Sequence, residues 1–268
     1  MPPMPHPHAP WALAFSALPW RESEKAAAWA RLELGEGLLR PPDLEDLWSR
    51  RGAFEVPGAR LLLPGDPEAD RLLAPLPYPV ALWVRGSAPP AAPAVAIVGS
   101  RKASAAGLAR ARAFGRALAE AEVAVLSGGA RGIDAAAHAG ALAGGPTWAV
   151  LGSGLNRPYP PEHGPLFDRI ARSGGGVLTP FPPEAEPRPA HFPRRNLLLA
   201  AWAQAILVIE ADPRSGSLVT ARLALDLGRD LYMCPGSPGT DAFLSEGAAA
   251  PCEDPTALIG ELRATLGT

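Results

Sequence analysis

The stretch Val95-Ala-Ile-Val-Gly-Ser-Arg101 decides the predicted fold, because it joins a buried strand to a helix through a turn of small residues. Val95–Val98 are four consecutive apolar residues, which is typical of a strand that is buried on both faces. Gly99 and Ser100 then turn the chain, and residues 105–121 carry apolar side chains at helical spacing. A strand, a tight turn and a helix N-terminus bring free N–H groups together, so the stretch predicts an anion site.

Arg101 strengthens this prediction, because its planar guanidinium suits phosphate. The glycine spacing differs from the dinucleotide fingerprint, and the Gly-Lys-Ser/Thr of a P-loop does not follow. On this stretch alone, a turn that serves packing only is the alternative.

Length and composition limit the class of protein. The 268 residues suffice for one large α/β domain and a smaller one. Cys234 and Cys252 lack Cys-x-x-Cys spacing, so we expect no disulfide framework and no metal site, and a reducing cytoplasm fits. No apolar run is long enough to span a membrane, and the Pro-rich N-terminus does not resemble a signal peptide. We therefore expect a cytoplasmic protein with no membrane partner.

The net charge of −2 does not by itself indicate a nucleic-acid binder. The charge is unevenly distributed, however. Residues 94–210 carry 12 Lys and Arg against 8 Asp and Glu, whereas the segments before and after are acidic. The positive excess therefore lies in the segment built around Arg101.

The chain divides into three predicted segments. Residues 1–51 predict a small helical domain, with helices over 11–18, 22–34 and 43–50 and a Pro-rich tail before them; we interpret it as a packing or oligomerisation element. Residues 52–77 are rich in Pro and Gly and predict a linker. Residues 78–268 form the main predicted domain.

In that domain strands and helices alternate, which predicts a mostly parallel sheet with helices on both faces. Strands are expected over 80–84, 95–98, 123–126, 147–151, 177–179, 205–209 and 231–233, and helices over 105–121, 134–142, 165–172, 194–202, 217–227 and 255–266. In such sheets ligands bind beyond the carboxyl ends of the strands.

The turns after four expected strands are rich in small and hydroxyl residues. Three of them begin at Gly99, Ser127-Gly128 and Gly152, and the fourth, residues 211–217, ends in Ser215-Gly216-Ser217. Each turn can bring backbone N–H groups close to a ligand. Four such turns at one rim favour an extended polyanion or nucleotide site.

A second binding signal is the helix start His191-Phe-Pro-Arg-Arg-Asn196. Two adjacent guanidiniums beside an aromatic ring suit a nucleic-acid strand, with phosphates on Arg194 and Arg195 and a base on Phe192. Taken alone, the segment is equally compatible with a core phenylalanine and a solvated helix start. The neighbouring turns favour binding.

Catalytic signals are weak. Asp134 and His138 lie four residues apart, but no nucleophile elbow accompanies them. We interpret Asp134 as a cap at the helix start and His138 as a packed, hydrogen-bonded histidine. Glu210, at a strand end, could hold a ribose hydroxyl, orient an arginine or act as a base. We expect no catalytic residues and no cofactor.

Taken together, the motifs resemble the DNA-processing protein A family, also called DprA or Smf. The resemblance covers about residues 78–250 and rests on motifs in the family's order: Val98-Gly-Ser-Arg101, Ser127–His138, Tyr159-Pro160, Phe192–Asn196, Ser215–Ala221, Gly228-Arg229 and Pro235-Gly236. It implies an extended Rossmann-like domain that binds single-stranded DNA, forms a homodimer and loads the RecA recombinase during natural transformation, without catalysis.

The resemblance also implies residue roles. Gly99, Ser100 and Arg101 would form the phosphate-binding turn, and Ser127, Gly128, Ser215, Gly216 and Ser217 would line the same groove. Phe192, Arg194, Arg195 and Asn196 would hold the strand, with Phe192 as a stacking platform.

The sequence departs from the family pattern at several positions. Leu197 stands where a further Arg is frequent, Thr179-Pro180 where Ser-Glu is frequent, and Gly239-Thr-Asp241 where Gly-x-Asn is usual. The sequence ends at Thr268, so we expect no winged-helix domain of the kind found in many relatives.

Two alternatives belong to other classes of protein. A nucleoside-monophosphate phosphoribohydrolase is the first, since Pro235–Thr240 is similar to the Pro-Gly-Gly-x-Gly-Thr-x-x-Glu motif of those lysine-decarboxylase-like enzymes; Phe243 stands where their catalytic Glu would fall. The second is a nucleotide-sensing scaffold that binds mononucleotides in the same turns.

Overall fold

The computed structural model describes residues 8–17, 22–33, 51–91 and 93–266. Its strands are β1 (Arg60–Leu62), β2 (Leu82–Gly86), β3 (Ala94–Val98), β4 (Ala124–Ser127), β5 (Thr147–Val150), β6 (Gly176–Thr179), β7 (Ala205–Val208), β8 (Asp230–Met233) and β9 (Ala250–Pro251). The helices are α1 (Ala9–Ala17), α2 (Glu22–Glu33), α4 (Pro67–Leu73), α5 (Ala105–Glu120), α6 (Ile133–Gly144), α7 (Gly164–Arg172), α8 (His191–Trp202), α9 (Gly216–Asp226), α10 (Pro238–Ser245) and α11 (Pro255–Leu266), with short 3₁₀ turns η1 (Arg51–Phe54) and η2 (Pro161–His163).

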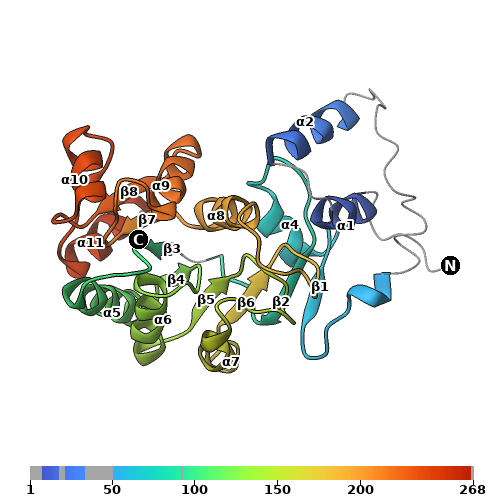
Figure 1. The fold of residues 1–268 in the computed structure, drawn as a ribbon, viewed down its shortest axis with the longest axis horizontal. Helices are drawn as coiled ribbons and strands as arrows, with labels where there is room; N and C mark the ends of the chain where they lie inside the picture. Colours follow the sequence, from blue (N-terminus) through green and yellow to red (C-terminus); the bar gives the residue numbers. More distant parts are fainter. Residues whose placement is uncertain (1–7, 18–21, 34–50, 92, 267–268) are drawn as a thin grey trace.

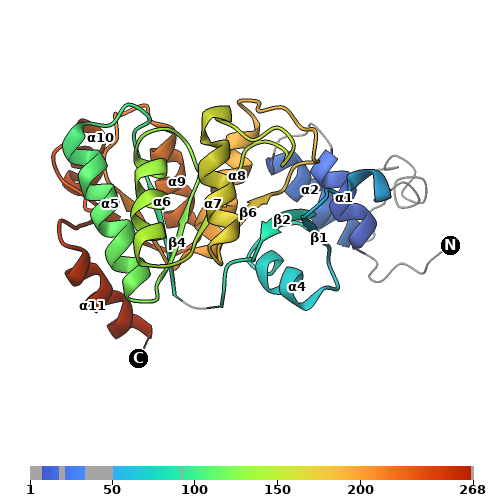
Figure 2. The same ribbon diagram turned by 90° about the horizontal axis from the view of Figure 1, so that it is seen from below.

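The described strands form a single sheet in the order β1-β2-β6-β5-β4-β3-β7-β8-β9 (Figure 1). All neighbours from β6 to β9 pair in parallel, whereas β2 runs antiparallel to both β6 and β1. Figure 2 shows α5, α6 and α7 on one face and α8 and α9 on the other. The predicted mostly parallel α/β fold with helices on both faces is therefore confirmed.

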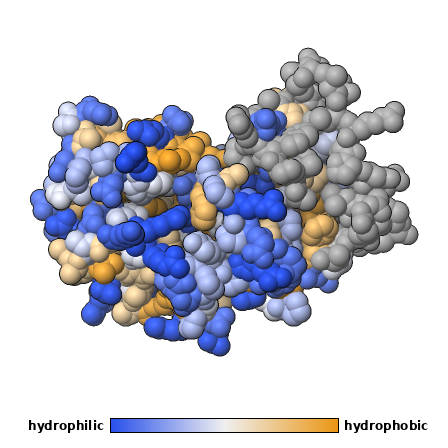
Figure 3. Space-filling model, in the orientation of Figure 1, coloured by the Kyte–Doolittle hydropathy of each residue, from blue (hydrophilic) through white to orange (hydrophobic). Residues whose placement is uncertain are grey.

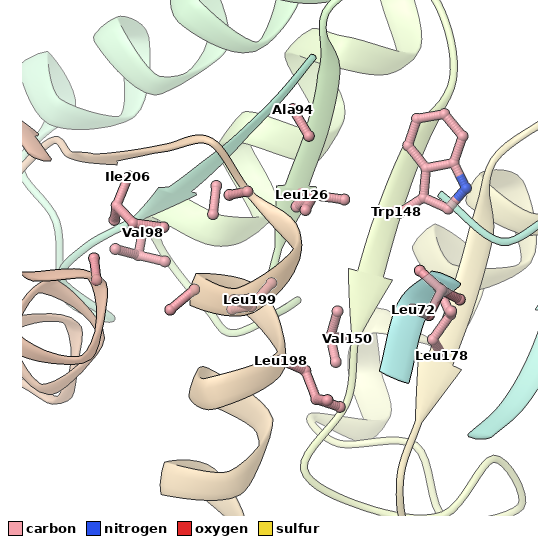
Figure 4. Close-up of a cluster of buried hydrophobic side chains, with 14 of the residues drawn as sticks. Leu72, Ala94, Val98, Leu126, Trp148, Val150, Leu178, Leu198, Leu199 and Ile206 are labelled. Atoms are coloured by element: carbon pink, nitrogen blue, oxygen red, sulfur yellow. The ribbon is translucent and has the colours of Figure 1, made fainter. Parts of the chain in front are cut away.

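The opening strand β3 lies inside this sheet, between β4 and β7, and is buried along its whole length. Its side chains alternate between the two faces. Val95 and Ile97 belong to the apolar cluster under α5 and α6, and Ala96 and Val98 to the cluster under α8 and α9. Figure 4 shows the second cluster, where Val98 lies near Leu199 of α8. Burial on both faces explains why the strand has no polar residue.

The two helices that follow β3 and β4 pack unusually closely. A Cβ atom at Gly115 of α5 would overlap the carbonyl oxygen of Ala137, and one at Gly140 of α6 would overlap that of Arg112. Both positions therefore require glycine, because any side chain would push the helices apart. This close contact holds the turns after β3 and β4 next to each other.

The N-terminal helices pack against the end of the sheet that carries β2. Phe15 of α1 contacts the rings of Trp29 of α2 and Tyr78, with centroid distances of 6.1 and 5.7 Å. The backbone N–H of Ala81 donates to Ser16 Oγ at 3.0 Å. The predicted small helical element is thus present and packed on the main domain. The expected helix over 43–50 lies outside the described residues.

The expected linker is the main correction to the predicted organisation. Residues 52–77 contain β1, which pairs with β2 at the edge of the sheet, and α4. Trp202 of α8 donates its indole N–H to Leu72 O at 2.8 Å, so α4 is fixed to the main domain. The first expected strand also begins later than predicted, at Leu82, and α10 and β9 were not predicted. Among the described residues no helix has the length and apolar character needed to cross a membrane.

His138 of α6 is fully buried and its Nδ1 lies 2.9 Å from Thr147 Oγ1, which donates to Val125 O at 2.8 Å. The prediction of a packed, hydrogen-bonded histidine is confirmed. Burial, followed by the charges of His163 and Arg195, lowers the pKa of His138 from 6.5 to about 3. Between these two values the unfolded chain binds a proton that the native protein does not bind. Stability must therefore fall as the pH is lowered through this interval.

We predict that the free energy of unfolding decreases by up to about 1.4 kcal/mol per pH unit from His138 alone as the pH falls below 6.5. Urea unfolding at a series of pH values measures this slope. In His138→Leu the slope should be smaller by that amount, whatever the absolute stability of the variant. Equal slopes in the two proteins would contradict the assignment.

Candidate functional site

A cavity of about 780 Å³ opens at the carboxyl ends of β3 and β7, beside α8 and α9. Nine of the twelve predicted site residues line it: Gly99, Ser100, Arg101, Phe192, Arg195, Asn196, Ser215, Gly216 and Ser217. Its lining carries four cationic side chains, Arg101, Lys102, Arg195 and Arg214, against the carboxylates of Asp134 and Asp212. The cavity thus has the position expected for a Rossmann-like site and a positive excess that favours an anion.

The N-terminus of α9 faces this cavity. Ser215 is the N-cap, and its Oγ accepts from the N–H of Ser217 at 3.3 Å and lies 2.7 Å from Ser217 Oγ. Gly216 and Ser217 follow in the first turn and line the cavity. The positive end of the helix dipole adds to the charges of Arg101 and Arg214.

The N-terminus of α5, by contrast, already holds a carboxylate of the chain itself. Ser104 caps α5, accepting from Gly107 N at 3.0 Å, and its own N–H and Oγ donate to Glu210 at 3.1 and 2.6 Å. The predicted anion site at this helix start is therefore occupied by Glu210. This contact also gives Glu210 a capping role in place of the ribose, arginine or base roles considered from the sequence.

Two guanidinium groups lie close to the ring of Phe192. The Cζ atom of Arg101 is 5.0 Å from the ring centroid, and that of Arg195 is 5.8 Å from it. The ring is half-buried beside Gly152, where a Cβ would contact it. Arg101 is exposed and reaches the ring from the turn after β3. The arrangement therefore places two cations within cation–π distance of one flat apolar ring.

Arg195 is only 6% exposed and bridges the ends of two strands. Its Nη1 donates to the carbonyl oxygens of Gly128 and, at 3.0 Å, Val150, and its Nε donates to Asn196 Oδ1 at 2.9 Å. Burial lowers the pKa of Arg195, and the charge of Asp134 opposes this change. Arg195 therefore forms part of the cavity wall, with most of its donors used inside the protein.

Asp134, the buried carboxylate in the cavity wall, accepts from the N–H groups of Gly128 and Ala130 at 3.1 and 3.3 Å. The prediction that Asp134 caps the helix start is wrong, because the N-cap of α6 is Gly132. The carboxylate of Asp134, in the first turn of α6, holds the preceding loop instead. Burial raises the pKa of Asp134, whereas Arg195 and these N–H groups lower it. His138, four residues on, hydrogen-bonds Thr147 and does not line the cavity.

Three predicted site residues do not line the cavity. Arg194 is 2% exposed and points toward α1, donating to Phe15 O at 3.1 Å. Ser127 is buried and donates to Ile97 O at 2.6 Å. Gly128 leaves space for the guanidinium of Arg195, which a Cβ there would overlap. A helix turns about 100° per residue, so the adjacent Arg194 and Arg195 face different parts of the protein.

The four strand-end turns contribute unequally. Those after β3 and β7 supply most of the lining, whereas the turn after β4 supplies Ala130 and the turn after β5 packs Gly152 against Phe192. Besides Asp134, the lining residues that were not among the predicted site residues are Val98, Lys102, Ala130, Leu199, Asp212, Pro213, Arg214 and Thr220. Lys102 and Arg214 were detectable, since Lys102 directly follows Arg101, Arg214 lies in the turn before Ser215, and each carries a positive charge. Among the described residues no cluster of His, Cys, Asp or Glu could hold a metal ion.

The fold and the cavity together define a Rossmann-like protein with a basic, partly aromatic site suited to a phosphate-bearing ligand. Residues 61–262 match the family described as DNA recombination-mediator protein A, and the chain belongs to that family. It is 41% identical over 187 residues to Protein Smf from Escherichia coli (strain K12), which covers 67% of this chain and 50% of that protein. The chain thus spans about half the length of the curated relatives it matches.

Two solved structures resemble this fold over most of the chain. DNA processing protein A from Streptococcus pneumoniae has a TM-score of 0.75 and 29% identity, covering 94% of this chain and 96% of its own. DNA processing protein A from Helicobacter pylori, whose single-stranded DNA binding mode has been described structurally, has a TM-score of 0.68 and 27% identity, covering 77% and 96%. The resemblance found in the sequence is confirmed at the level of the family.

We predict that Arg195→Lys lowers the free energy of unfolding by about 2 kcal/mol or more. A lysine keeps the positive charge but cannot reach both strand-end carbonyls and Asn196 from one planar group, and each unsatisfied buried acceptor costs about 1–3 kcal/mol. Urea unfolding at neutral pH measures the loss. Arg116→Lys on the exposed side of α5 is the matched control; if both variants were equally stable, the bridging geometry would be irrelevant.

Proposed function

We propose that the chain binds single-stranded DNA in the cavity between β3, β7, α8 and α9, and that it acts as a recombination mediator that loads RecA onto incoming DNA in natural transformation. The observation that carries the proposal is Phe192, whose ring lies within 6 Å of the guanidiniums of both Arg101 and Arg195 at a basic cavity. The family membership and the single-stranded DNA binding of the Helicobacter pylori relative support it.

The cavity chemistry accounts for binding without sequence preference. Arg101, Lys102 and Arg214 neutralise phosphates, the first turn of α9 donates backbone N–H groups, and Phe192 stacks on a base. None of these contacts reads a base edge, so the protein accepts any sequence. Arg194, which the sequence placed among the strand contacts, is left out because its guanidinium is buried against α1.

We propose that the functional unit is a homodimer formed through α9. Val219 and Leu225 on this helix are 39% and 41% exposed. Figure 3 shows apolar residues gathered in the upper left part of the molecule, where Figure 1 places α9. A second copy would cover them, and sedimentation velocity of the protein and of Leu225→Asp tests this.

The free cysteines Cys234 and Cys252 fit the reducing cytoplasm in which RecA acts.

Fluorescence anisotropy of labelled oligo-dT across a salt series tests the proposal, with duplex DNA and AMP as competitors. We expect tight binding that weakens steeply with salt and that AMP competes with poorly. Strong competition by AMP, with no gain from longer strands, would instead favour a nucleotide pocket and overturn the proposal.

Phe243, at the position of the phosphoribohydrolase glutamate, is buried in the core. The absence of catalysis stays a prediction, tested by incubating the protein with AMP.

RecA loading needs a separate measurement. We expect the protein to accelerate RecA filament formation on single-stranded DNA that is coated with a single-strand-binding protein. Tight DNA binding without any acceleration would restrict the function to strand binding and overturn the loading step.

We predict that Arg101→Ala reduces the slope of log affinity against log salt by about 0.7, the value for one phosphate contact on a single strand. The loss should be uniform across base sequences, because the guanidinium contacts phosphate. Arg116→Ala, which removes an exposed arginine of α5, is the control for total charge. An unchanged slope in Arg101→Ala would remove this residue from the phosphate site.

Phe192→Ala should weaken oligo-dT binding by about 1–3 kcal/mol, the range for loss of one base–aromatic stack. Phe192→Tyr keeps the flat ring and should retain most of the affinity. The same anisotropy titration measures both, and circular dichroism confirms folding. A folded Phe192→Ala protein with a much smaller loss would show that the ring serves packing alone.

A further inference from the structure

Four side chains form a continuous row that begins at the cavity and continues beyond it. Arg101 lies over Phe192 at 5.0 Å, the rings of Phe192 and Tyr159 are 6.4 Å apart, and Arg131 lies over Tyr159 at 5.8 Å. We call these four residues the arginine–aromatic row. They come from the segments after β3, β4 and β5 and from the start of α8, so only the folded sheet brings them together.

Half of the row lies outside the cavity. Arg101 and Phe192 line the cavity, whereas Tyr159 and Arg131 do not. Tyr159 is half-buried and Arg131 is exposed, so a ring and a guanidinium are both accessible at the surface beside the cavity. The outer half of the row thus repeats the pairing of cation and ring that Arg101 and Phe192 make inside.

We propose that Tyr159 and Arg131 form a second nucleotide subsite, where a single strand that leaves the cavity places its next base on Tyr159 and a phosphate on Arg131. This subsite rests on the proposed function and adds the path of the strand. Aromatic rings accept any base, and an arginine beside the ring contacts the phosphate that follows, so the subsite is again indifferent to sequence.

The geometry of the two rings sets the conformation of the strand. Their centroids are 6.4 Å apart, well beyond the rise of about 3.4 Å between stacked bases, and their planes are inclined by 59°. Two bases that stack on these rings cannot stack on each other. The row therefore selects an unstacked, turning single strand and excludes a duplex, whose bases stay paired and parallel.

Glu162 positions the outer arginine. Its Oε1 accepts from Arg131 Nε at 2.5 Å, and this contact and the Tyr159 hydroxyl raise the pKa of Arg131. The pairing holds the guanidinium beside the ring of Tyr159 and uses its Nε–H. The carboxylate also places a negative charge beside the strand, which opposes phosphate binding. Glu162 thus orients Arg131 and limits the affinity of the subsite.

Anisotropy titrations with oligo-dT of about 4 and about 16 nucleotides separate the two subsites. Tyr159→Ala should weaken binding of the long strand at least about fivefold, the lower end expected for one base–aromatic stack. Binding of the short strand, which the cavity alone holds, should stay unchanged. Tyr159→Phe should bind both strands as the wild type does. Tyr159→Leu, which keeps apolar bulk without a flat ring, should behave like Tyr159→Ala and guards against a folding defect.

The two charged residues give an independent readout. Arg131→Ala should lower the salt slope by about 0.7 with the long strand only, and Glu162→Gln should tighten binding of the long strand. Arg157→Ala is the matched control, because this exposed arginine lies two residues before Tyr159 in the segment after β5 but pairs with Glu184 and Glu186. It should leave both slopes unchanged.

The outcomes distinguish the subsite from the function on which it rests. If the wild-type protein binds both strands and the Tyr159 and Arg131 variants bind the long strand equally well, the subsite is overturned and the cavity function stands. Equal losses with short and long strands would show that Tyr159 only supports Phe192, which also overturns the subsite. Failure of the wild-type protein to bind oligo-dT would overturn both proposals.

Discussion

The cavity depends on the buried guanidinium of Arg195. A buried cation must find partners, and Arg195 finds them in the strand-end carbonyls of Gly128 and Val150, with the carboxylate of Asp134 offsetting its charge. These contacts tie the ends of β4 and β5 to the start of α8 and place Phe192, three residues earlier, at the cavity. Gly128 has to lack a side chain for the same reason. Arg195 is therefore a structural residue with one face toward the cavity.

The start of α8 connects the cavity to the N-terminal helices. Arg194, next to Arg195, donates to Phe15 O and lies 5.2 Å from the ring of Phe181 and 5.8 Å from that of Tyr78. Removing one partner from such a buried contact costs far more than removing a surface ion pair. The N-terminal helices thus support the same helix turn that carries Phe192. Two arginines that look equivalent in the sequence hold different sides of one helix start.

The parallel part of the sheet was predictable because its strands are short apolar runs bounded by Gly and Ser turns. Predicted and observed bounds agree within one or two residues from β3 to β8. The edge of the sheet was not predictable, since β1 has only three residues in a segment rich in Pro and Gly. α10 was not predicted, although its Pro238 is compatible with a helix, because Pro is well tolerated in the first turn, where its missing N–H has no partner to lose.

The sequence by itself determined the succession of strands, turns and helices along the chain from β3 to β8, and with it the turns and the aromatic helix start that surround the cavity. Local periodicity and small-residue turns are properties of neighbouring residues, so they are readable along the chain. Only the tertiary structure decided that Glu210 caps Ser104 across 106 positions, that Arg195 bridges to Gly128 across 67, and that Tyr159 and Arg131 extend the row from Phe192. Such contacts depend on which strand ends become neighbours, and strand order is a property of the whole fold.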